Sequence, residues 1–174
     1  MQAITRWLLL SIMILTPAVA SAQGETDDSN FFWDVTKGVL FDPTTYTPAV
    51  LTYTSMKLDW DSSQVLFRNG WVEQNHRFTV SGRPNDIPLS YADGNRKIQQ
   101  MALLHLQESV VNNLAANVFE NVLAAKYPQH RKLFKVLSWM ERIAFASYVS
   151  YVASSSHFKQ AERNRQLAFE YGFK

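Results

Sequence analysis

Cysteine is absent from all 174 residues of the chain. This absence excludes disulfides, zinc–thiolate sites, a lipid-carrying cysteine, the Cys-x-x-Cys-His attachment of haem and thiol nucleophiles. Small exported domains that lack a sufficient core usually add disulfides. The core of this chain must therefore suffice without covalent cross-links.

An excess of charge of one sign is also lacking, because 17 Lys and Arg residues are balanced by 15 Asp and Glu residues. This balance argues against nucleic acid as a main partner, and we expect none. The sequence contains no Gly-x-Ser-x-Gly elbow and no glycine-rich phosphate loop. Their absence argues against a serine nucleophile and against a phosphate site.

The amino terminus has the pattern of a secretory signal. Arg6 precedes the apolar run of residues 7–15, which is followed by Pro17 and by the small-x-small sequence of residues 20–22. Signal peptidase cleaves after such a sequence. We therefore predict a signal peptide over residues 1–22 and a location in the periplasm or cell envelope. An amino-terminal membrane anchor is the alternative, although the apolar run is shorter than the ~20 residues that a span needs.

The rest of the chain is expected to form one domain. Residues 23–30 hold no apolar side chain, which predicts a flexible acidic linker. Residues 31–174 have the composition of one compact domain, with a hydrophobic content of 47% over the whole chain. We predict a single helical domain over residues 31–174.

Proline, glycine and capping residues divide this domain into an all-α bundle of three principal helices. In order, we expect a short amino-terminal helix from Phe31 to near Gly38, a helix from Asp42 or Thr47 to Asn69 and a long ordered loop over 70–95. We then expect a helix that begins between Asn95 and Lys97 and runs to Lys126, a helix from Pro128 to about Ser155, and a basic helical tail over 157–169. The tail is either separate from the third principal helix or continuous with it as far as Tyr171. A loop of this length in a compact domain is uncommon unless it is functional or locally structured.

Helical spacing assigns a face to each residue. In the first principal helix an apolar face carries Tyr46, Ala49, Val50, Tyr53, Met56, Trp60, Gln64 and Phe67, and the neighbouring face carries Thr52, Ser55, Asp59 and Ser62. In the second, His105, Glu108, Ser109 and Asn112 interrupt the face expected to be buried. The third is apolar almost all round between Leu133 and Val152, which predicts a central helix.

Polar residues at the end of the first helix, in the loop and along the other two helices form the candidate binding site. We expect them to meet at a junction in which residues 70–76 fold over the polar stripe of the second helix. Its members are Asp59, Asp61, Glu73, Asn75, His76, His105, Glu108, Asn112, Glu141 and Arg142. Glu141 and Arg142 are neighbours that point in different directions, so one of them should meet Asp59, Asp61 or His105 across the bundle.

Two pairs in this set have the spacing of metal ligands. Glu73-x-x-His76 has the order found in di-iron bundles, which need that motif on two helices together with two further glutamates. Here it occurs once, outside a predicted helix, and His105-x-x-Glu108 has the reverse order. We therefore expect no metal and no cofactor, with Glu73 binding loop amides and His105 hydrogen-bonded in the core.

Four asparagines on the second helix, Asn112, Asn113, Asn117 and Asn121, are unusual because asparagine is a poor helix former. Either they hydrogen-bond to the other helices and fix the register of the bundle, or they line a polar cavity. The first interpretation is favoured.

A membrane-embedded bundle is weighed against a periplasmic one. Lys135, Glu141 and Arg142 would each cost ~2.5–3.5 kcal/mol near the middle of a bilayer. The periplasmic bundle is therefore preferred. If the chain were inserted, the same polar stripe would become the functional site, because buried polar groups in a membrane are expensive.

Asp59-x-x-Ser62, followed by Asn69-Gly70-x-x-Glu73-x-Asn75, resembles a pattern in small uncharacterised bacterial helical membrane proteins. In that family the asparagine is typically followed by proline, whereas this chain has His76. The resemblance covers fewer than about twenty residues and carries no assigned activity. It implies that this junction contacts the other helices, and it raises the weight of the membrane interpretation.

The sequence thus favours a non-enzymatic, structural or binding protein of the cell envelope. Its aromatic segment, residues 31–41, and its basic tail would contact a membrane surface or an envelope protein. One alternative is a metal-binding protein or enzyme with a carboxylate and histidine site inside the bundle. The other is a membrane-embedded helical protein.

Overall fold

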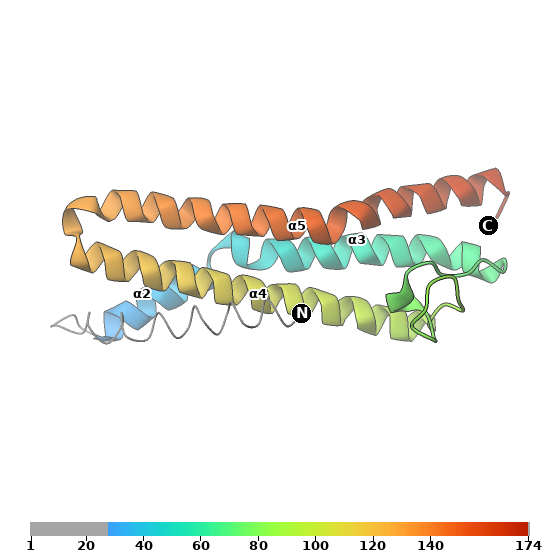
Figure 1. Cartoon of the computed structure of the whole chain (residues 1–174), viewed down its shortest axis with the longest axis horizontal. Helices are drawn as coiled ribbons and strands as arrows, with labels where there is room; N and C mark the ends of the chain where they lie inside the picture. The colour runs from blue at the N-terminus through green and yellow to red at the C-terminus, as the bar shows by residue number, and fades with distance from the viewer. Residues whose placement is uncertain (1–27, 174) are drawn as a thin grey trace. The chain divides into compact units, whose positions relative to one another are not determined.

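The computed structural model describes residues 28–173 (Figure 1). The described elements are α2 (Asp28–Leu40), α3 (Pro43–Arg68), the 3₁₀ turn η1 (His76–Phe78), α4 (Tyr91–Lys126), the 3₁₀ turn η2 (Pro128–His130) and α5 (Arg131–Glu170). Extended pairing in this part of the chain is limited to two isolated bridges in the loop before α4. The predicted all-α bundle of three principal helices is confirmed.

Several boundaries differ from the predicted ones. The predicted signal peptide lies outside the described residues, and the last three residues of the predicted linker belong to α2, which begins at Asp28. Helix α4 starts earlier than expected, at Tyr91, because Ser90 caps it by accepting a hydrogen bond from the Asp93 N–H at 3.1 Å. The basic tail is the last part of α5, which runs without interruption to Glu170.

The chain separates into two compact units. The first unit contains the described residues up to Thr45 together with Val110–Phe145, and the second contains Tyr46–Ser109 together with the chain from Ala146. Helices α3, α4 and α5 each contribute residues to both units.

In the first unit, α2 lies against the second half of α4 (Figure 1). A Cβ atom on Gly38 would lie 2.2 Å from Oδ1 of Asn117, so this close approach requires glycine. Asn113 donates hydrogen bonds to the Thr44 and Thr45 hydroxyls, at 2.8 and 2.7 Å. The interpretation that helix asparagines fix the bundle register is thus supported at Asn113.

The aromatic core lies in the second unit. The Trp60 ring packs against Phe67 and Phe78, with centroid distances of 5.6 and 5.3 Å. A Cβ atom on Gly94 would lie 2.2 Å from the Trp60 indole, so the start of α4 can meet this ring only at a glycine. Met56 and Ile98 complete the buried cluster.

The loop between α3 and α4 is ordered by its own polar groups. Asn75 caps η1 by accepting a hydrogen bond from the Arg77 N–H at 3.1 Å. Backbone bonds join Glu73 to Asp86 in both directions, at 2.9 and 3.2 Å. After η1, Thr79 is extended and forms an isolated antiparallel bridge with Pro88.

Polar side chains occupy much of the interior. Among the buried residues are Thr45, Thr52, Ser55, Ser63, Ser109, Asn113, Asn117, Arg142, Ser150, Ser154 and Asn164. Several of the hydroxyls donate to the carbonyl one turn back on the same helix, as Ser109 does to His105 at 2.8 Å. Such a hydroxyl needs no partner on another helix, and it lets neighbouring helices pack closely.

The apolar face of α3 is divided between interior and surface. Tyr46, Val50 and Tyr53 on it are exposed, whereas Met56 and Trp60 on it are buried, as are Thr52 and Ser55 on the neighbouring face. The prediction that the third principal helix is central is wrong, because many apolar side chains of α5 are exposed, including Leu133, Val136, Leu137, Trp139, Met140, Tyr148, Tyr151 and Val152. Outside the cluster around Trp60, many helix contacts are made by small and polar side chains, while many large apolar side chains are exposed.

Candidate functional site

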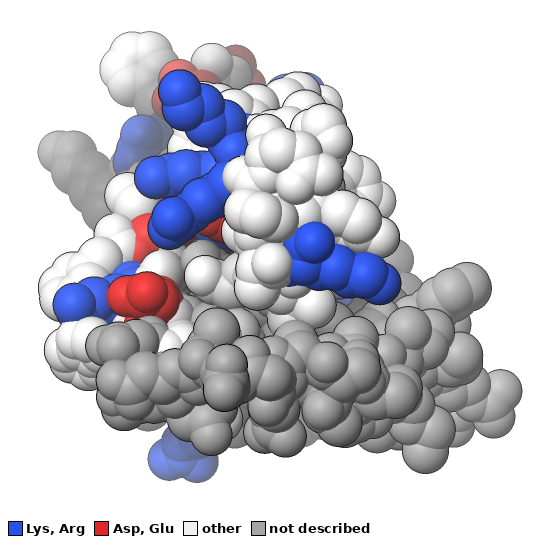
Figure 2. All heavy atoms as spheres, turned by 90° about the vertical axis from the view of Figure 1, so that its left-hand side faces the viewer, with Lys and Arg blue, Asp and Glu red and all other residues white. Residues whose placement is uncertain are grey.

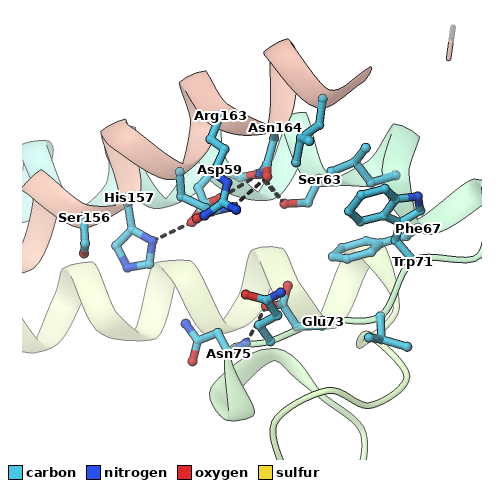
Figure 3. A pocket seen from close by; sticks show the side chains of 15 residues that line it. Asp59, Ser63, Phe67, Trp71, Glu73, Asn75, Ser156, His157, Arg163 and Asn164 are labelled. Atoms are coloured by element: carbon cyan, nitrogen blue, oxygen red, sulfur yellow. Dashed lines mark hydrogen bonds and ion pairs between the residues drawn. The ribbon is translucent and has the colours of Figure 1, made fainter. Parts of the chain in front are cut away.

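A pocket of about 270 Å³ lies in the second unit, between α3, the last part of α5 and the loop after α3 (Figure 3). Its walls differ in chemistry. One side carries Asp59, Ser63 and Asn164, the opposite side carries Glu73 and Asn75, and aromatic rings form one end.

Asp59 of α3 is the centre of the hydrogen-bond network in this pocket. Its Oδ2 lies 2.7 Å from Nδ1 of His157, and its Oδ1 accepts a hydrogen bond from the Asn164 amide at 3.1 Å. The same amide donates to the Ser63 hydroxyl at 2.8 Å. His157 and Asn164 are seven residues apart on α5, two helical turns, so they reach α3 from one face.

Glu73 enters the pocket from the loop. Its Oε1 accepts a hydrogen bond from the Asn75 N–H at 2.6 Å. No Lys, Arg or His of residues 28–173 forms an ion pair with it. Burial raises the pKa of the Glu73 carboxyl, and the nearby Asp59 carboxylate adds to this, while the N–H groups of Asn75 and Gln74 and the nearby His157 act in the opposite direction. Folding therefore places the Glu73 carboxyl in surroundings that disfavour its ionised form.

A pH dependence follows from the raised pKa of Glu73. The native state binds this proton more tightly than the unfolded state, so the contribution to stability is present at low pH and is lost as the pH rises through the raised pKa. Glu73→Gln removes the charge but keeps the acceptor for the Asn75 N–H. We expect the variant and the parent to have similar melting temperatures at about pH 4, and the variant to be the more stable at about pH 7.5.

Thermal unfolding followed by circular dichroism across this pH range measures the difference. Glu170→Gln at the exposed end of α5 is the matched control and should leave the profile unchanged. A constant difference between parent and Glu73→Gln at all pH values would contradict a raised pKa.

The Asp59–His157 pair has the geometry of an oriented imidazole. A carboxylate that binds Nδ1 leaves Nε2 as the atom able to accept a proton, which is how histidine is positioned as a general base. No serine hydroxyl of the described chain hydrogen-bonds to His157, whose hydrogen-bond partner there is Asp59. The pair can therefore move a proton but is not joined to a nucleophile.

The predicted site residues lie in different parts of the structure. Asp59, Glu73 and Asn75 line the pocket. Asp61 instead pairs with Lys57 and accepts a hydrogen bond from the Tyr91 hydroxyl, and His76 is exposed at the start of η1.

The helix residues of the predicted junction do not join this pocket. His105 and Glu108 pair with each other on α4, with 2.9 Å between Nδ1 and Oε2. In the first unit, Asn112 donates to Glu141 at 3.4 Å. His105 and Asn112 are separated by about two turns, ~10 Å along the helix, so one short loop segment would not cover both.

The expectation that Glu141 or Arg142 meets Asp59, Asp61 or His105 is wrong. Arg142 is buried in the first unit, where its Nε lies 3.0 Å from Oδ2 of Asp42, an ion pair without the angle of a hydrogen bond. Its Nη1 lies 3.8 Å from Oε2 of Glu120. These two acidic residues compensate the buried guanidinium, so it does not need the carboxylates predicted from sequence.

His157, Asn164 and Ser63 are site residues that sequence reasoning missed. The spacing of His157 and Asn164 on α5 and of Asp59 and Ser63 on α3 places each pair on one helix face, and this was the available signal. The described residues contain no group of three or more His, Asp or Glu side chains that could hold a metal ion.

Comparison with known proteins gave no match: no family model, no curated protein and no solved structure is detectably similar to this chain.

Proposed function

We propose that this protein is a lipid-contacting, non-enzymatic helical protein of the cell envelope. The observation that carries the proposal is the distribution of side chains, with polar groups buried and large apolar groups exposed in both units. In water the reverse distribution is favoured, since burial of one large apolar side chain is worth about 1.5–3 kcal/mol. Lipid removes this penalty from the outer surface, and helices in lipid pack through small and polar residues.

The exposed apolar groups are numerous and lie on successive turns. In the first unit they include Phe32, Trp33, Phe41, Leu114, Phe119, Leu133, Val136, Leu137, Trp139 and Met140, and in the second Tyr46, Val50, Tyr53, Leu103, Leu104, Tyr148, Tyr151 and Val152. Soluble monomers rarely expose large contiguous apolar patches. Within the described chain, no helix has the length and apolar character required to cross a membrane. We therefore propose that these exposed apolar side chains contact lipid.

Basic groups accompany the apolar surface in the first unit. Figure 2 shows Lys and Arg side chains gathered at the end of this unit, where α4 passes into α5. The exposed cations there are Lys126, Arg131, Lys132 and Lys135, and residues 121–140 contain no acidic residue. Exposed Tyr127 and Trp139 lie in the same segment. Cations beside such amphipathic rings suit the headgroup region of an anionic membrane.

Vesicle flotation of the mature chain tests the proposal. We expect the protein to float with phosphatidylcholine vesicles and more strongly with vesicles that contain phosphatidylglycerol. The combined substitution Val136→Ser, Trp139→Ser and Met140→Ser should lower the partition coefficient by at least about 100-fold, because three apolar side chains lose their lipid contact. Circular dichroism should show unchanged helix content, since all three side chains are exposed.

The matched control replaces three exposed polar side chains, Gln107, Glu162 and Gln166, by serine and should float like the parent. A mature chain that remains monomeric in buffer and floats with neither kind of vesicle would overturn the proposal. Deletion of residues 31–41 is a poorer test than substitution, because Val35 and Val39 are buried and Val39 O accepts a hydrogen bond from Thr45.

A further inference from the structure

We propose that the pocket of the second unit binds a small ligand in which a primary ammonium group is attached to an apolar or aromatic body. The binding groups are Glu73 and Asp59 for the ammonium, and Trp71 and Phe67 for the body. This site is separate from the proposed lipid contact, because none of the exposed apolar side chains assigned to that contact lines the pocket.

The charge inside the pocket is incompletely compensated. Figure 3 shows Asp59 and Glu73 on opposite sides of the cavity, one from α3 and one from the loop. Asp59 is compensated by His157 and by the Asn164 amide. Glu73 has only backbone amides as hydrogen-bond partners, and Arg163 at the pocket wall is exposed and forms no ion pair with it. A cation on a ligand would complete the ion pair that the described chain leaves open.

The hydrogen-bond acceptors that line the pocket near Glu73 suit an ammonium group. Such a group donates three hydrogen bonds and accepts none. The pocket offers it the Glu73 carboxylate, the Asp59 carboxylate and the Ser63 hydroxyl oxygen. A metal ion is a poorer candidate, since the described part of the chain groups no three suitable ligands.

The aromatic end supplies a place for the ligand body. Trp71 is held edge-on to Tyr171 at a centroid distance of 5.5 Å, and Phe67 is held against Trp60. Both rings are therefore positioned by packing outside the pocket before a ligand enters, which reduces the entropy lost on binding. A ring face near an ammonium group also attracts the cation directly. The volume of about 270 Å³ limits the ligand to a small molecule.

Isothermal titration of the mature chain with 2-phenylethylamine tests the assignment at about pH 7.5. We expect saturable binding of the amine and none of 2-phenylethanol or phenylacetate at the same concentrations. Glu73→Gln should weaken amine binding by about 10- to 100-fold, the loss expected for one charge-assisted hydrogen bond. Glu170→Gln, a substitution at an exposed position on α5, should bind the amine like the parent.

The pH dependence supplies a second readout. Affinity for the amine should fall as the pH is lowered and Glu73 takes up its proton. Asp59, His157 and Arg163 also line the pocket, so Glu73→Gln should reduce this pH dependence without abolishing it. Equal binding of amine and alcohol would reduce the pocket to an apolar site and overturn the proposal, as would preferential binding of phenylacetate or no binding at all. Glu73→Gln should still float with vesicles like the parent, so failure of amine binding is distinguishable from failure of the lipid proposal.

Discussion

Trp60→Ala is expected to lower the free energy of unfolding by about 3–5 kcal/mol, the range for removal of a large buried aromatic side chain. The indole is 3% exposed and is the common contact of Phe67, Phe78 and Gly94. Met56, Phe78 and Ile98 are buried in the same cluster, so removal of the indole leaves a cavity inside the core of this unit. The pocket should loosen as well, since Phe67 is held by this ring.

Urea unfolding followed by circular dichroism measures the effect without dependence on tryptophan fluorescence. Trp139→Ala is the matched control, because this indole is 55% exposed and its removal should change stability by less than about 0.5 kcal/mol in buffer. Equal effects of the two substitutions would show that Trp60 does not have the central position described above.

Arg142→Met in the first unit is expected to lower the free energy of unfolding by a similar amount, about 3–5 kcal/mol, because it removes the cation of a buried ion pair and leaves the carboxylates. The guanidinium is buried between Asp42 and Glu120. Methionine has a similar length but no charge, so both carboxylates would remain in place without their counter-ion. The cost comes mainly from these uncompensated charges and not from lost volume.

A triple variant separates charge from packing. Arg142→Met combined with Asp42→Asn and Glu120→Gln removes all three charges and should recover most of the lost stability. Asparagine at position 42 keeps the side-chain oxygen that accepts a hydrogen bond from the Thr44 N–H at the start of α3.

The control for this series is Arg165→Met. Arg165 pairs with Glu162 at 3.8 Å on the exposed surface of α5, where an ion pair is worth about 0–1 kcal/mol. Failure of the triple variant to recover stability would mean that Arg142 acts through packing of its hydrocarbon stem.

Much of the fold was accessible from local signals. Pro43, Gly70 and Pro128 mark the limits of the principal helices because proline and glycine act on the backbone of their own neighbourhood. The ordered loop was predicted from its length alone. The contacts that order it, the Asn75 cap and the pairing of Glu73 with Asp86, could be identified only from the structure. Asp59, Glu73 and Asn75, three members of the predicted junction, line one pocket.

The partners of these residues were not accessible in the same way. Asp59 and His157 are 98 positions apart, and their contact depends on how α5 is rotated about its axis beside α3. Periodicity gives the relative phase of residues within one helix but not the phase between two helices. His105 and Glu108 illustrate the converse, since their spacing predicted a pair on one helix and the structure contains it.

The amino-acid sequence by itself determined that this protein is a bundle of long helices without covalent cross-links, with an ordered polar loop between the first two principal helices. Only the tertiary structure decided which helix faces are inside. Several buried serine hydroxyls donate to carbonyls of their own helix, and Asn113 and Arg142 have partners on other elements, so polar faces can pack at low cost. Apolar spacing identifies the apolar face of a helix, but only the tertiary structure shows which of its residues are buried, as Met56 and Trp60 are, and which are exposed, as Tyr148 and Tyr151 are. We propose that lipid covers the exposed ones.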